Sequence, residues 1–437
     1  MIQLPQNFID RMQKQLPKNE WEAFFAVYAN EKPFKGVRIN RLKGETERIC
    51  AMLPFIGEKI EWAQAGYYTR DEKLGASPFH HAGLFYSQEP SAMCAVPHLQ
   101  VQAGEKVLDL CSAPGGKATQ IAEYMQGQGI LVCNEPISSR AKILSQNIER
   151  MGVKNAVVTN EMPSALAKKL PEYFDKILVD APCSGEGMFR KNTQEAVAEW
   201  SDENVTLCSI RQAEILHEAS KMLKVGGRLV YSTCTFSTQE DEEQAQNFVT
   251  SHPEFVLLEQ DKLYPHKVAG EGHFVAVFEK TAQGEKSEIP VRIREHKRFV
   301  SRETEKIYRE FERKFFNAPF ATNLHEVKGV LYDLPKDVFE LQGLSLLRAG
   351  VRLGEIKNGR FEPNHALCMA VRADECANVL NYAIHDTRVE KFLRGETIDD
   401  ESAKQGWCLV CVQGYPLGLG KAVGGVVKNH LPKGIRK

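Results

Sequence analysis

Two cysteines stand where an apolar stretch of the chain gives way to small and polar residues. Cys183 lies in the stretch DAPCSGEG and Cys234 in the stretch STCT. Proline, serine, threonine and glycine beside them are typical of a chain that is leaving a sheet. A cysteine thiolate is a strong nucleophile, and covalent attack divides a difficult substitution into easier steps. The pattern therefore indicates catalytic thiols, with small buried hydrophobic side chains as the alternative interpretation.

A glycine-rich turn precedes these cysteines at residues 109–117, which read DLCSAPGGK. Glycine lets the backbone approach a ligand closely, and the helix that opens after the turn offers free N–H groups to a carboxylate or phosphate. The spacing differs from the G-x-G-x-x-G fingerprint of dinucleotide-binding proteins. Glu135 follows about 20 residues later, where a Rossmann-like site contacts ribose hydroxyls. We predict a ligand-binding turn; a turn that serves only packing and an exposed loop carboxylate are the alternatives.

The order of strands and helices explains why these residues should meet. Apolar runs predict strands at 106–113, 129–134, 155–159, 174–180, 227–233 and 272–280, and helical patterns predict helices at 118–125, 138–151, 206–223 and 237–250. This alternation predicts a doubly wound, mostly parallel α/β sheet, which binds ligands at the carboxyl ends of its strands. Cys183 and Cys234 each follow such a strand, so we expect both thiols to face one crevice.

The regions on either side of the sheet have a different character. Residues 1–81 read as an α+β preamble, with helices at 7–16 and 20–29 and a strand at 36–39. We expect the doubly wound domain to cover 82–280, a basic extension 281–328 and a β-rich region 329–437. Cys408 and Cys411 resemble half of a zinc site, but residues three apart in a strand point to opposite faces. No second pair stands at zinc spacing, so no metal is expected.

Composition narrows the class of protein. The chain has 437 residues, of which 43% are hydrophobic and 26% charged, as in ordinary globular proteins. Its apolar runs are far shorter than the ~20 residues of a membrane helix and no signal-peptide pattern opens it, so we expect a cytoplasmic protein without a membrane partner. Eleven cysteines, an odd number, argue for reduced thiols rather than a disulfide framework.

Charge is distributed unevenly along the chain. Residues 281–437 carry 26 Lys and Arg against 21 Asp and Glu, a net of +5, while the remaining residues carry 30 against 36, a net of −6. A basic C-terminal third beside an acidic remainder indicates a polyanion-binding region. Within it stands a basic cluster that forms either a solvated face or a set of phosphate contacts: Arg292, Arg294, Lys297 and Arg298.

Four stretches together carry a resemblance to a known family: YSQEPSAM (86–93), DLCSAPGGK (109–117), DAPCSGEGMFRK (180–191) and YSTCTFSTQEDE (231–242). Their order and spacing resemble the motif set of the Nop/Sun-type RNA cytosine-5 methyltransferases, over about residues 86–280. The ending, residues 414–437, resembles the PUA-like tail of the bacterial ribosomal RNA small-subunit methyltransferase F group. The resemblance implies a Rossmann-like class I methyltransferase core with an N-terminal α+β preamble and a β-rich, PUA-like C-terminal region.

The resemblance also implies which residues bind the cofactor, S-adenosylmethionine. The turn would hold it through Cys111, Ser112, Ala113, Pro114, Gly115, Gly116 and Lys117. Glu135 would bind the ribose, with Arg140 beside it, and Asp180 would lie at the junction of cofactor and target base. Many relatives carry an aspartate after the third strand to touch the adenine. Here Asn160 either makes that contact through its amide or caps a loop.

The two thiols would have different catalytic roles. By the resemblance, Cys234 attacks C6 of cytosine and Cys183 assists release of the methylated base. C5 of cytosine is a poor nucleophile until a thiolate adds at C6 and pushes electron density onto C5, which then takes the methyl group. The C5 proton must then leave and the thiolate be eliminated, which requires a base near Cys183. Thiolate formation requires an electropositive setting, which Lys117 or Lys191 could supply.

The sequence therefore predicts an S-adenosylmethionine-dependent enzyme that makes 5-methylcytosine in RNA, specifically in small-subunit (16S) ribosomal RNA. We expect it to act as a monomer on RNA and not on DNA. The nearest alternative is the same chemistry on transfer RNA. An alternative of another class is a catalytically silent ribosome-assembly factor, which would require neither thiol. DNA cytosine-5 enzymes use the thiol after the fourth strand as nucleophile, so they would not require Cys234.

Overall fold

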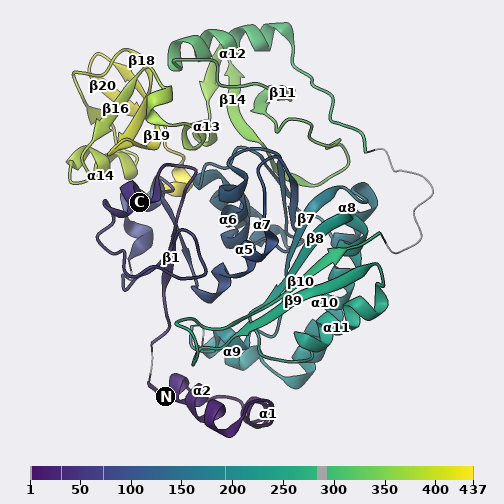
Figure 1. The fold of residues 1–437 in the computed structure, drawn as a ribbon. Coiled ribbons are helices and arrows are strands. Elements are labelled where there is room, and N and C mark those ends of the chain that lie inside the picture. The colour runs from purple at the N-terminus through teal and green to yellow at the C-terminus, as the bar shows by residue number, and fades with distance from the viewer. Residues whose placement is uncertain (1, 31, 72, 192, 283–292, 437) are drawn as a thin grey trace.

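An eight-stranded sheet runs through the middle of the molecule (Figure 1). The computed structural model describes residues 2–30, 32–71, 73–191, 193–282 and 293–436. The strand order is β13-β6-β5-β4-β7-β8-β10-β9. The strands are β4 (Lys106–Asp109), β5 (Ile130–Asn134), β6 (Ala156–Thr159), β7 (Phe174–Asp180), β8 (Leu223–Thr233), β9 (Phe255–Leu263), β10 (His273–Lys280) and β13 (Leu346–Ala349).

The five strands β4 to β8 are parallel, and β9, β10 and β13 join the sheet antiparallel. Alternate residues of each strand face opposite sides of the sheet. Val107, Leu131 and Val230 belong to one apolar core, while Leu108, Val132 and Leu229 belong to the other. Burial on both faces is characteristic of a parallel sheet covered by helices on each side. The predicted doubly wound architecture is confirmed.

Helices cover both faces of this sheet. One face packs against α5 (Ala95–Leu99), α6 (Gly116–Met125) and α7 (Ser138–Arg150). The other packs against α8 (Pro163–Lys169), α10 (Asp202–Met222) and α11 (Glu242–Ser251), and α9 (Thr193–Glu199) precedes α10. The helix predicted at 237–250 begins later, at Glu242, because residues before it form a turn in which Glu240 and Asp241 are fully buried.

The N-terminal region has two parts. Helices α1 (Gln6–Gln15) and α2 (Lys18–Asn30) pack Phe8 and Phe24 against Phe189, Trp200 and Phe236 of the central region. A small antiparallel sheet in the order β2-β1-β3 follows. Its elements are β1 (Gly36–Ile39), α3 (Thr46–Cys50), β2 (Gly66–Tyr68), α4 (Pro78–His81) and β3 (Phe85–Gln88). The predicted helices and strand of the preamble are confirmed.

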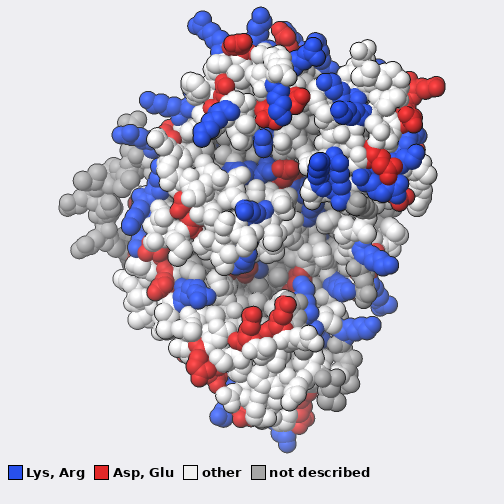
Figure 2. All heavy atoms as spheres, turned by 180° about the vertical axis from the view of Figure 1, so that it is seen from behind, with Lys and Arg blue, Asp and Glu red and all other residues white. Residues whose placement is uncertain are grey.

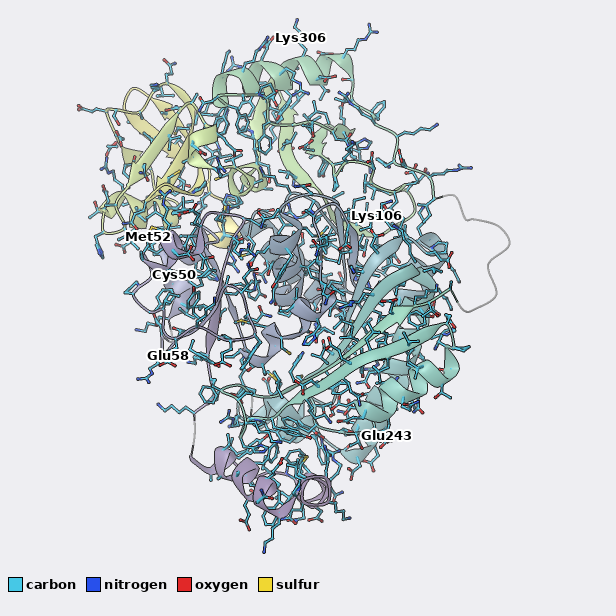
Figure 3. All side chains as sticks on the ribbon, in the orientation of Figure 1. Cys50, Met52, Glu58, Lys106, Glu243 and Lys306 are labelled. Carbon is cyan, nitrogen blue, oxygen red and sulfur yellow. The ribbon has the colours of Figure 1, made fainter. Side chains whose placement is uncertain are left out.

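The C-terminal region is rich in β-structure, as predicted. Helix α12 (Arg302–Phe315) lies at the top of the molecule, where its exposed Lys306 projects outward (Figure 3). A four-stranded sheet contains β11 (Leu324–Val327), β12 (Val330–Asp333), β14 (Val351–Lys357) and β15 (Arg360–Pro363). A five-stranded sheet contains β16 (Val379–Tyr382), β18 (Gly406–Val412), β19 (Tyr415–Val423), β20 (Val426–Asn429) and β17 (Ile398–Asp399), accompanied by α13 (His365–Ala370) and α14 (Thr387–Leu393).

The two ends of the chain share one hydrophobic core. Ile39 and Phe85 of the N-terminal sheet belong to the same buried cluster as Phe392 and Val410 of the C-terminal region. Cys408 lies in this cluster and Cys411 lies in another, on the opposite face of β18, as the alternation of a strand predicts. All eleven cysteines are free thiols. Of the basic cluster, Arg292 lies outside the described residues.

Among the residues described, no helix is long and apolar enough to cross a membrane.

Candidate active site

The glycine-rich turn connects the end of β4 to the start of α6. Asp109 is fully buried and accepts a hydrogen bond of 3.0 Å from Ser112 Oγ, while the Ser112 amide donates to the Asn134 carbonyl over 2.8 Å. Gly115 has a φ of +110°, and a Cβ there would lie 3.2 Å from Leu144 Cδ1. Only glycine adopts this conformation without strain, so the turn depends on it.

Two further predicted cofactor residues, Arg140 and Asn160, lie around Glu135. The Glu135 carboxylate accepts a hydrogen bond of 2.9 Å from the Ile137 amide, and its other oxygen lies 3.4 Å from Arg140 Nη1. Arg140 also donates to the Ala113 carbonyl over 3.0 Å, so it links Glu135 to the glycine-rich turn. Asn160 Nδ2 donates to the carbonyls of Glu135 and Pro136 at 2.7 and 2.9 Å. In this structure the Asn160 amide therefore caps a loop.

A crevice of about 260 Å³ opens where β4, β7 and β8 end. Of the predicted site residues, it is lined by Cys111, Ser112, Ala113, Pro114, Gly116, Lys117, Asp180 and Cys234. Gly115, Glu135, Arg140, Asn160 and Cys183 are not among its lining residues. Lys191 lines the crevice as well, although its side chain is exposed.

The two thiols meet because their strands are parallel neighbours. Asp180, the last residue of β7, pairs with Ser232 of β8, so Cys183 and Cys234 leave the sheet at the same level. Their Sγ atoms are 3.2 Å apart, and the Cys234 amide donates to Cys183 Sγ over 3.4 Å. The hydrogen bond to Cys234, together with burial, raises the pKa of Cys183 well above its ordinary value. Cys183 is therefore a thiol at neutral pH.

A charged pair lies in the same crevice. Lys117 Nζ is 2.9 Å from Asp180 Oδ1, which also accepts a hydrogen bond of 2.8 Å from Ser232 Oγ. Burial opposes both charges, but each group stabilises the other: the pKa of Lys117 is raised and that of Asp180 is lowered. The Lys117 ammonium also interacts electrostatically with the Cys234 thiol.

His273 is a crevice residue that the sequence did not single out. It begins β10 next to Phe274, which pairs with Thr233, so the two strands bring His273 beside Cys234. The imidazole is 1% exposed, neither ring nitrogen has a hydrogen-bond partner among the described residues, and Nε2 lies 3.8 Å from Asp180 Oδ1. Burial and the Lys117 charge lower the pKa of His273 to about 3, so the ring is neutral. A histidine opening a strand after glycine was its only sequence signal.

Buried carboxylates connect the loops that carry Cys183 and Cys234 through hydrogen bonds. Glu240 accepts a hydrogen bond of 2.9 Å from the Ser184 amide, and Glu186 accepts one of 3.0 Å from the Phe236 amide. Each bond connects the segment around Cys183 with the segment after Cys234. Such bonds hold reactive side chains in position. These acids were missed because an isolated glutamate in a sequence gives no sign of burial.

Comparisons with known proteins agree with this architecture. Residues 96–279 match the family model described as 16S rRNA methyltransferase RsmB/F, and residues 4–90 match the N-terminal domain of 16S rRNA methyltransferase RsmF. Residues 310–371 match the RsmF rRNA methyltransferase first C-terminal domain, and 379–437 match the methyltransferase RsmF PUA domain.

Two relatives that match this chain over nearly their whole length carry the same name. The chain is 31% identical to the ribosomal RNA small subunit methyltransferase F of Shewanella halifaxensis, over 100% of this chain and 98% of that protein. It is 32% identical to the protein of the same name from an Enterobacter species, over 98% and 95% of the two chains.

Solved structures share the fold. A methyltransferase homolog protein from Pyrococcus horikoshii gives a TM-score of 0.53 at 25% identity, over 63% of this chain and 100% of that one. NSun6 from Pyrococcus horikoshii with SFG gives a TM-score of 0.58 at 20% identity, over 64% and 99%.

Fold and site together define a methyltransferase with a Rossmann-like core, whose cofactor is S-adenosylmethionine. Within that class, the chain belongs to the family of ribosomal RNA small subunit methyltransferase F, in the Nop/Sun group. The predicted family, fold and cofactor are confirmed.

Proposed function

We propose that this protein methylates C5 of a cytosine in small-subunit (16S) ribosomal RNA through a covalent Cys234–C6 adduct, with Cys183 assisting release. The observation that carries the proposal is the pair of thiols 3.2 Å apart beside the Lys117–Asp180 ion pair. Binding alone would require neither thiol. Covalent pyrimidine chemistry requires both a nucleophile and a means of releasing it.

The residues around the turn fit the cofactor. Gly116 and Lys117, the first residues of α6, line the crevice, and such a helix start favours a carboxylate. Glu135 offers carboxylate oxygens for ribose hydroxyls once Arg140 moves aside, and Asp109 Oδ1 is buried without a hydrogen-bond partner in the described structure. When bound, S-adenosylmethionine supplies an activated methyl group. In this proposal, Lys117 and Asp180 lie at the junction of cofactor and target base.

The thiols have different roles because their surroundings differ. Cys234 lines the crevice together with Lys117, which is buried and paired with Asp180, so we assign the electropositive setting of the nucleophile to Lys117 rather than to the exposed Lys191. The Cys234 thiolate would form a bond to C6, and C5 would then take the methyl group from the sulfonium of bound S-adenosylmethionine, which would leave as S-adenosylhomocysteine. After a base takes the C5 proton, the C6–S bond breaks. The protonated Cys183 donates a hydrogen bond to the departing Cys234 sulfur, which assists release.

Asp180 and His273 give the crevice polar contacts for the target base. The Asp180 carboxylate is charged and can accept a hydrogen bond from the exocyclic amino group of cytosine. We assign the neutral His273 imidazole to the same base, because its nitrogens are buried and unpartnered in the described structure. A buried polar group without a partner requires an explanation, and for His273, which lines the crevice, a base bound there supplies one. The base must leave its stack to reach them.

Several features support RNA as the partner. The relatives are named for ribosomal RNA, and the last residues match a PUA domain model. Figure 2 shows many Lys and Arg side chains over the upper part of the molecule, which contains the C-terminal elements. Positive charge of this kind neutralises phosphates without reading sequence. The proposal includes a monomeric enzyme that leaves DNA unmodified.

Methyl transfer from radiolabelled S-adenosylmethionine tests the proposal. Small subunits, naked ribosomal RNA, transfer RNA and DNA are offered as separate pools, with Cys234→Ala as the control. We expect 5-methylcytosine in small subunits or their RNA and none with Cys234→Ala. Label in transfer RNA alone would assign the enzyme to the other substrate. If none of the pools were labelled, the result would contradict methyltransferase activity and favour the catalytically silent assembly factor.

A further inference from the structure

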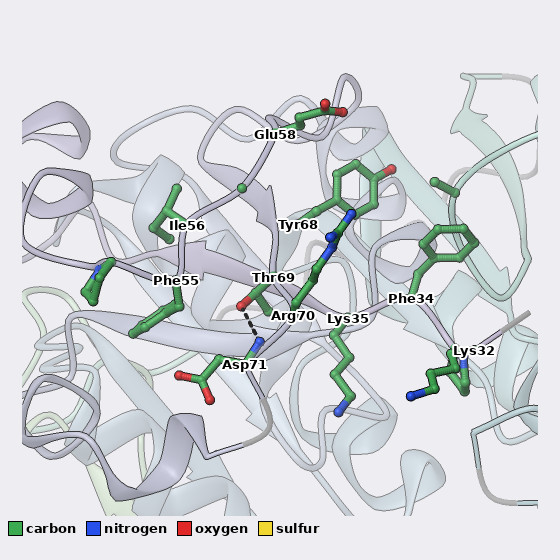
Figure 4. A pocket seen from close by; sticks show the side chains of 14 residues that line it. Lys32, Phe34, Lys35, Phe55, Ile56, Glu58, Tyr68, Thr69, Arg70 and Asp71 are labelled. Carbon is green, nitrogen blue, oxygen red and sulfur yellow. Dashed lines mark hydrogen bonds between the residues drawn. The ribbon is translucent and has the colours of Figure 1, made fainter.

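A second, larger hollow lies in the N-terminal region. Its volume is about 930 Å³, and three separate segments form its walls: residues 32–35 before β1, 54–58 after α3, and 68–71 at the end of β2, with Ala269 beside them (Figure 4). We call it the N-terminal groove. Nothing in the chemistry of the thiols or the cofactor uses it.

Aromatic rings and cations dominate its lining. Phe34, Phe55 and Tyr68 are half-buried, so part of each ring faces the groove, and the rings of Phe34 and Tyr68 lie 6.3 Å apart. In Figure 4 the Arg70 side chain extends beside Tyr68. Lys32 and Arg70 are exposed and form no ion pair among the described residues. Among the described residues, the acidic members of the lining are Glu58 and Asp71, and Asp71 accepts a hydrogen bond from the Lys73 amide.

The groove and the catalytic crevice share a wall. Ala269 lines the groove, while Glu271 and Gly272 line the crevice. The Phe34 amide donates to Glu271 over 3.0 Å, and the Arg190 guanidinium, which pairs with Glu271 at 2.8 Å, lies 5.6 Å from the Phe34 ring centroid. Residues 269–272 span at most about 14 Å. This length corresponds to about four stacked nucleotides at ~3.4 Å each. An RNA strand whose target base enters the crevice therefore reaches the N-terminal groove within a few nucleotides.

We infer that the N-terminal groove binds single-stranded RNA that flanks the target base. A base stacks on Phe34 or Tyr68, and Lys32 and Arg70 contact the phosphates. Stacking platforms beside cations are the usual means of holding single strands, because every base has a ring face and every linkage a charge. The inference rests on the proposed function, and it adds the position and the single-stranded state of the RNA.

Two variants test the groove independently. Phe34→Ala removes a stacking platform, and Arg70→Ala removes an exposed cation with little risk to folding. Arg211→Ala, which removes an exposed arginine from α10, is the matched control. The probe is a fluorescein-labelled single-stranded oligocytidylate of about 10 nucleotides, read by anisotropy over a range of salt, with a duplex RNA of equal length for comparison.

We expect Phe34→Ala to weaken single-strand binding roughly 5- to 100-fold. Arg70→Ala should reduce the slope of log Kd against log salt by about 0.7. Arg211→Ala should match the wild type, duplex binding should change little, and S-adenosylmethionine affinity should stay constant. If the wild type methylates ribosomal RNA while both groove variants keep its Kd and salt slope, the groove inference is overturned and the function stands. If the wild type transfers no methyl group to RNA, both the proposed function and the groove inference are overturned.

Discussion

At the residue scale, the surroundings within the crevice shift the pKa values of its titratable groups in different directions. Burial, reinforced by the charge of Asp180, raises the pKa of Asp109 to about 7. Burial also opposes the charge of Asp180 itself, but Lys117 outweighs it and the pKa of Asp180 falls below its ordinary value. Titratable groups that are pushed apart in this way acquire distinct roles. In the proposed mechanism, Asp180 is the anion that faces the target base and Cys183 is the protonated hydrogen-bond donor.

The buried Asp109 makes stability depend on pH. The pKa of Asp109 is about 7 in the folded chain, whereas its ordinary value is 3.8. Between these two pH values the folded state therefore binds more protons than the unfolded state. The stability it contributes is present at low pH and is lost as pH rises through about 7. We expect the melting temperature of the wild type, measured relative to Asp109→Asn without cofactor, to fall between about pH 5 and about pH 8. An equal difference at both pH values would contradict the raised pKa.

His273→Phe keeps the ring volume and removes both nitrogens. If His273 contacts the base, kcat/KM for RNA should fall roughly 5- to 100-fold, the loss expected for one buried hydrogen bond. Cofactor affinity, measured by calorimetry, should not change. His385→Phe, at an exposed histidine, is the control. Unchanged kcat/KM, or a loss of cofactor affinity as large as the loss of kcat/KM, would refute the assignment.

At the element scale, parallel neighbours β7 and β8 end side by side, and β10 returns next to β8. These pairings bring Asp180, Cys234 and His273 to one crevice from positions far apart in the sequence. The close approach of the loops is visible at Gly187, where an added Cβ would lie 3.0 Å from the Cys234 carbonyl and 3.1 Å from the Glu271 carbonyl.

Gly187→Ala tests whether this close approach supports catalysis. The added methyl group must push the Cys234 loop away, so we expect kcat to fall at least tenfold and the free energy of unfolding to drop by about 1–3 kcal/mol. Gly75→Ala, at a glycine with nothing within 4 Å of the added carbon, should leave both unchanged. Methyl-transfer kinetics and denaturant unfolding provide the readouts. A fully active Gly187→Ala enzyme would show that the loop spacing is unimportant.

Local pattern was sufficient for the strands that carry the cofactor turn and both cysteines, because their apolar runs are short and continuous and give way to small and polar residues. Strand β9 was missed because five of its nine side chains are exposed and its second half is interrupted by the charged and polar run EQDK. Strand β13 was missed because it forms only by pairing with β6, nearly two hundred residues away in the chain. His273 and Glu240 were missed for the same reason, since long-range packing creates their burial. The roles of the predicted site residues stay predictions.

At the scale of the whole molecule, the regions at the two ends of the chain are packed together. Residues of the N-terminal sheet and of the five-stranded C-terminal sheet form a single buried cluster, and β13 extends the central sheet. Burying apolar surface between regions makes their unfolding interdependent. The proposed limits at residues 81, 280 and 328 follow changes in the sequence pattern. They do not separate regions that each have an independent hydrophobic core.

Leu417→Ala tests this shared core. Leu417 on β19 is 1% exposed within the shared cluster, so its truncation should cost about 2–5 kcal/mol. Val423→Ala, on the same strand but 62% exposed, should cost less than about 0.5 kcal/mol. Hydrogen exchange should show that amides of β1 and β3 lose protection together with those of β19. Loss confined to the C-terminal strands would contradict a common core.

The central claim is that two thiols divide attack and release, and trapping the adduct tests it most directly. Cys183→Ala is incubated with small-subunit ribosomal RNA and S-adenosylmethionine, then resolved by denaturing electrophoresis beside the Cys183→Ala/Cys234→Ala double variant. The account predicts a nuclease-sensitive protein–RNA band for Cys183→Ala that is absent from the double variant, because release is slowed while attack is intact. Normal turnover of Cys183→Ala without such a band, or a band that persists without Cys234, would contradict it.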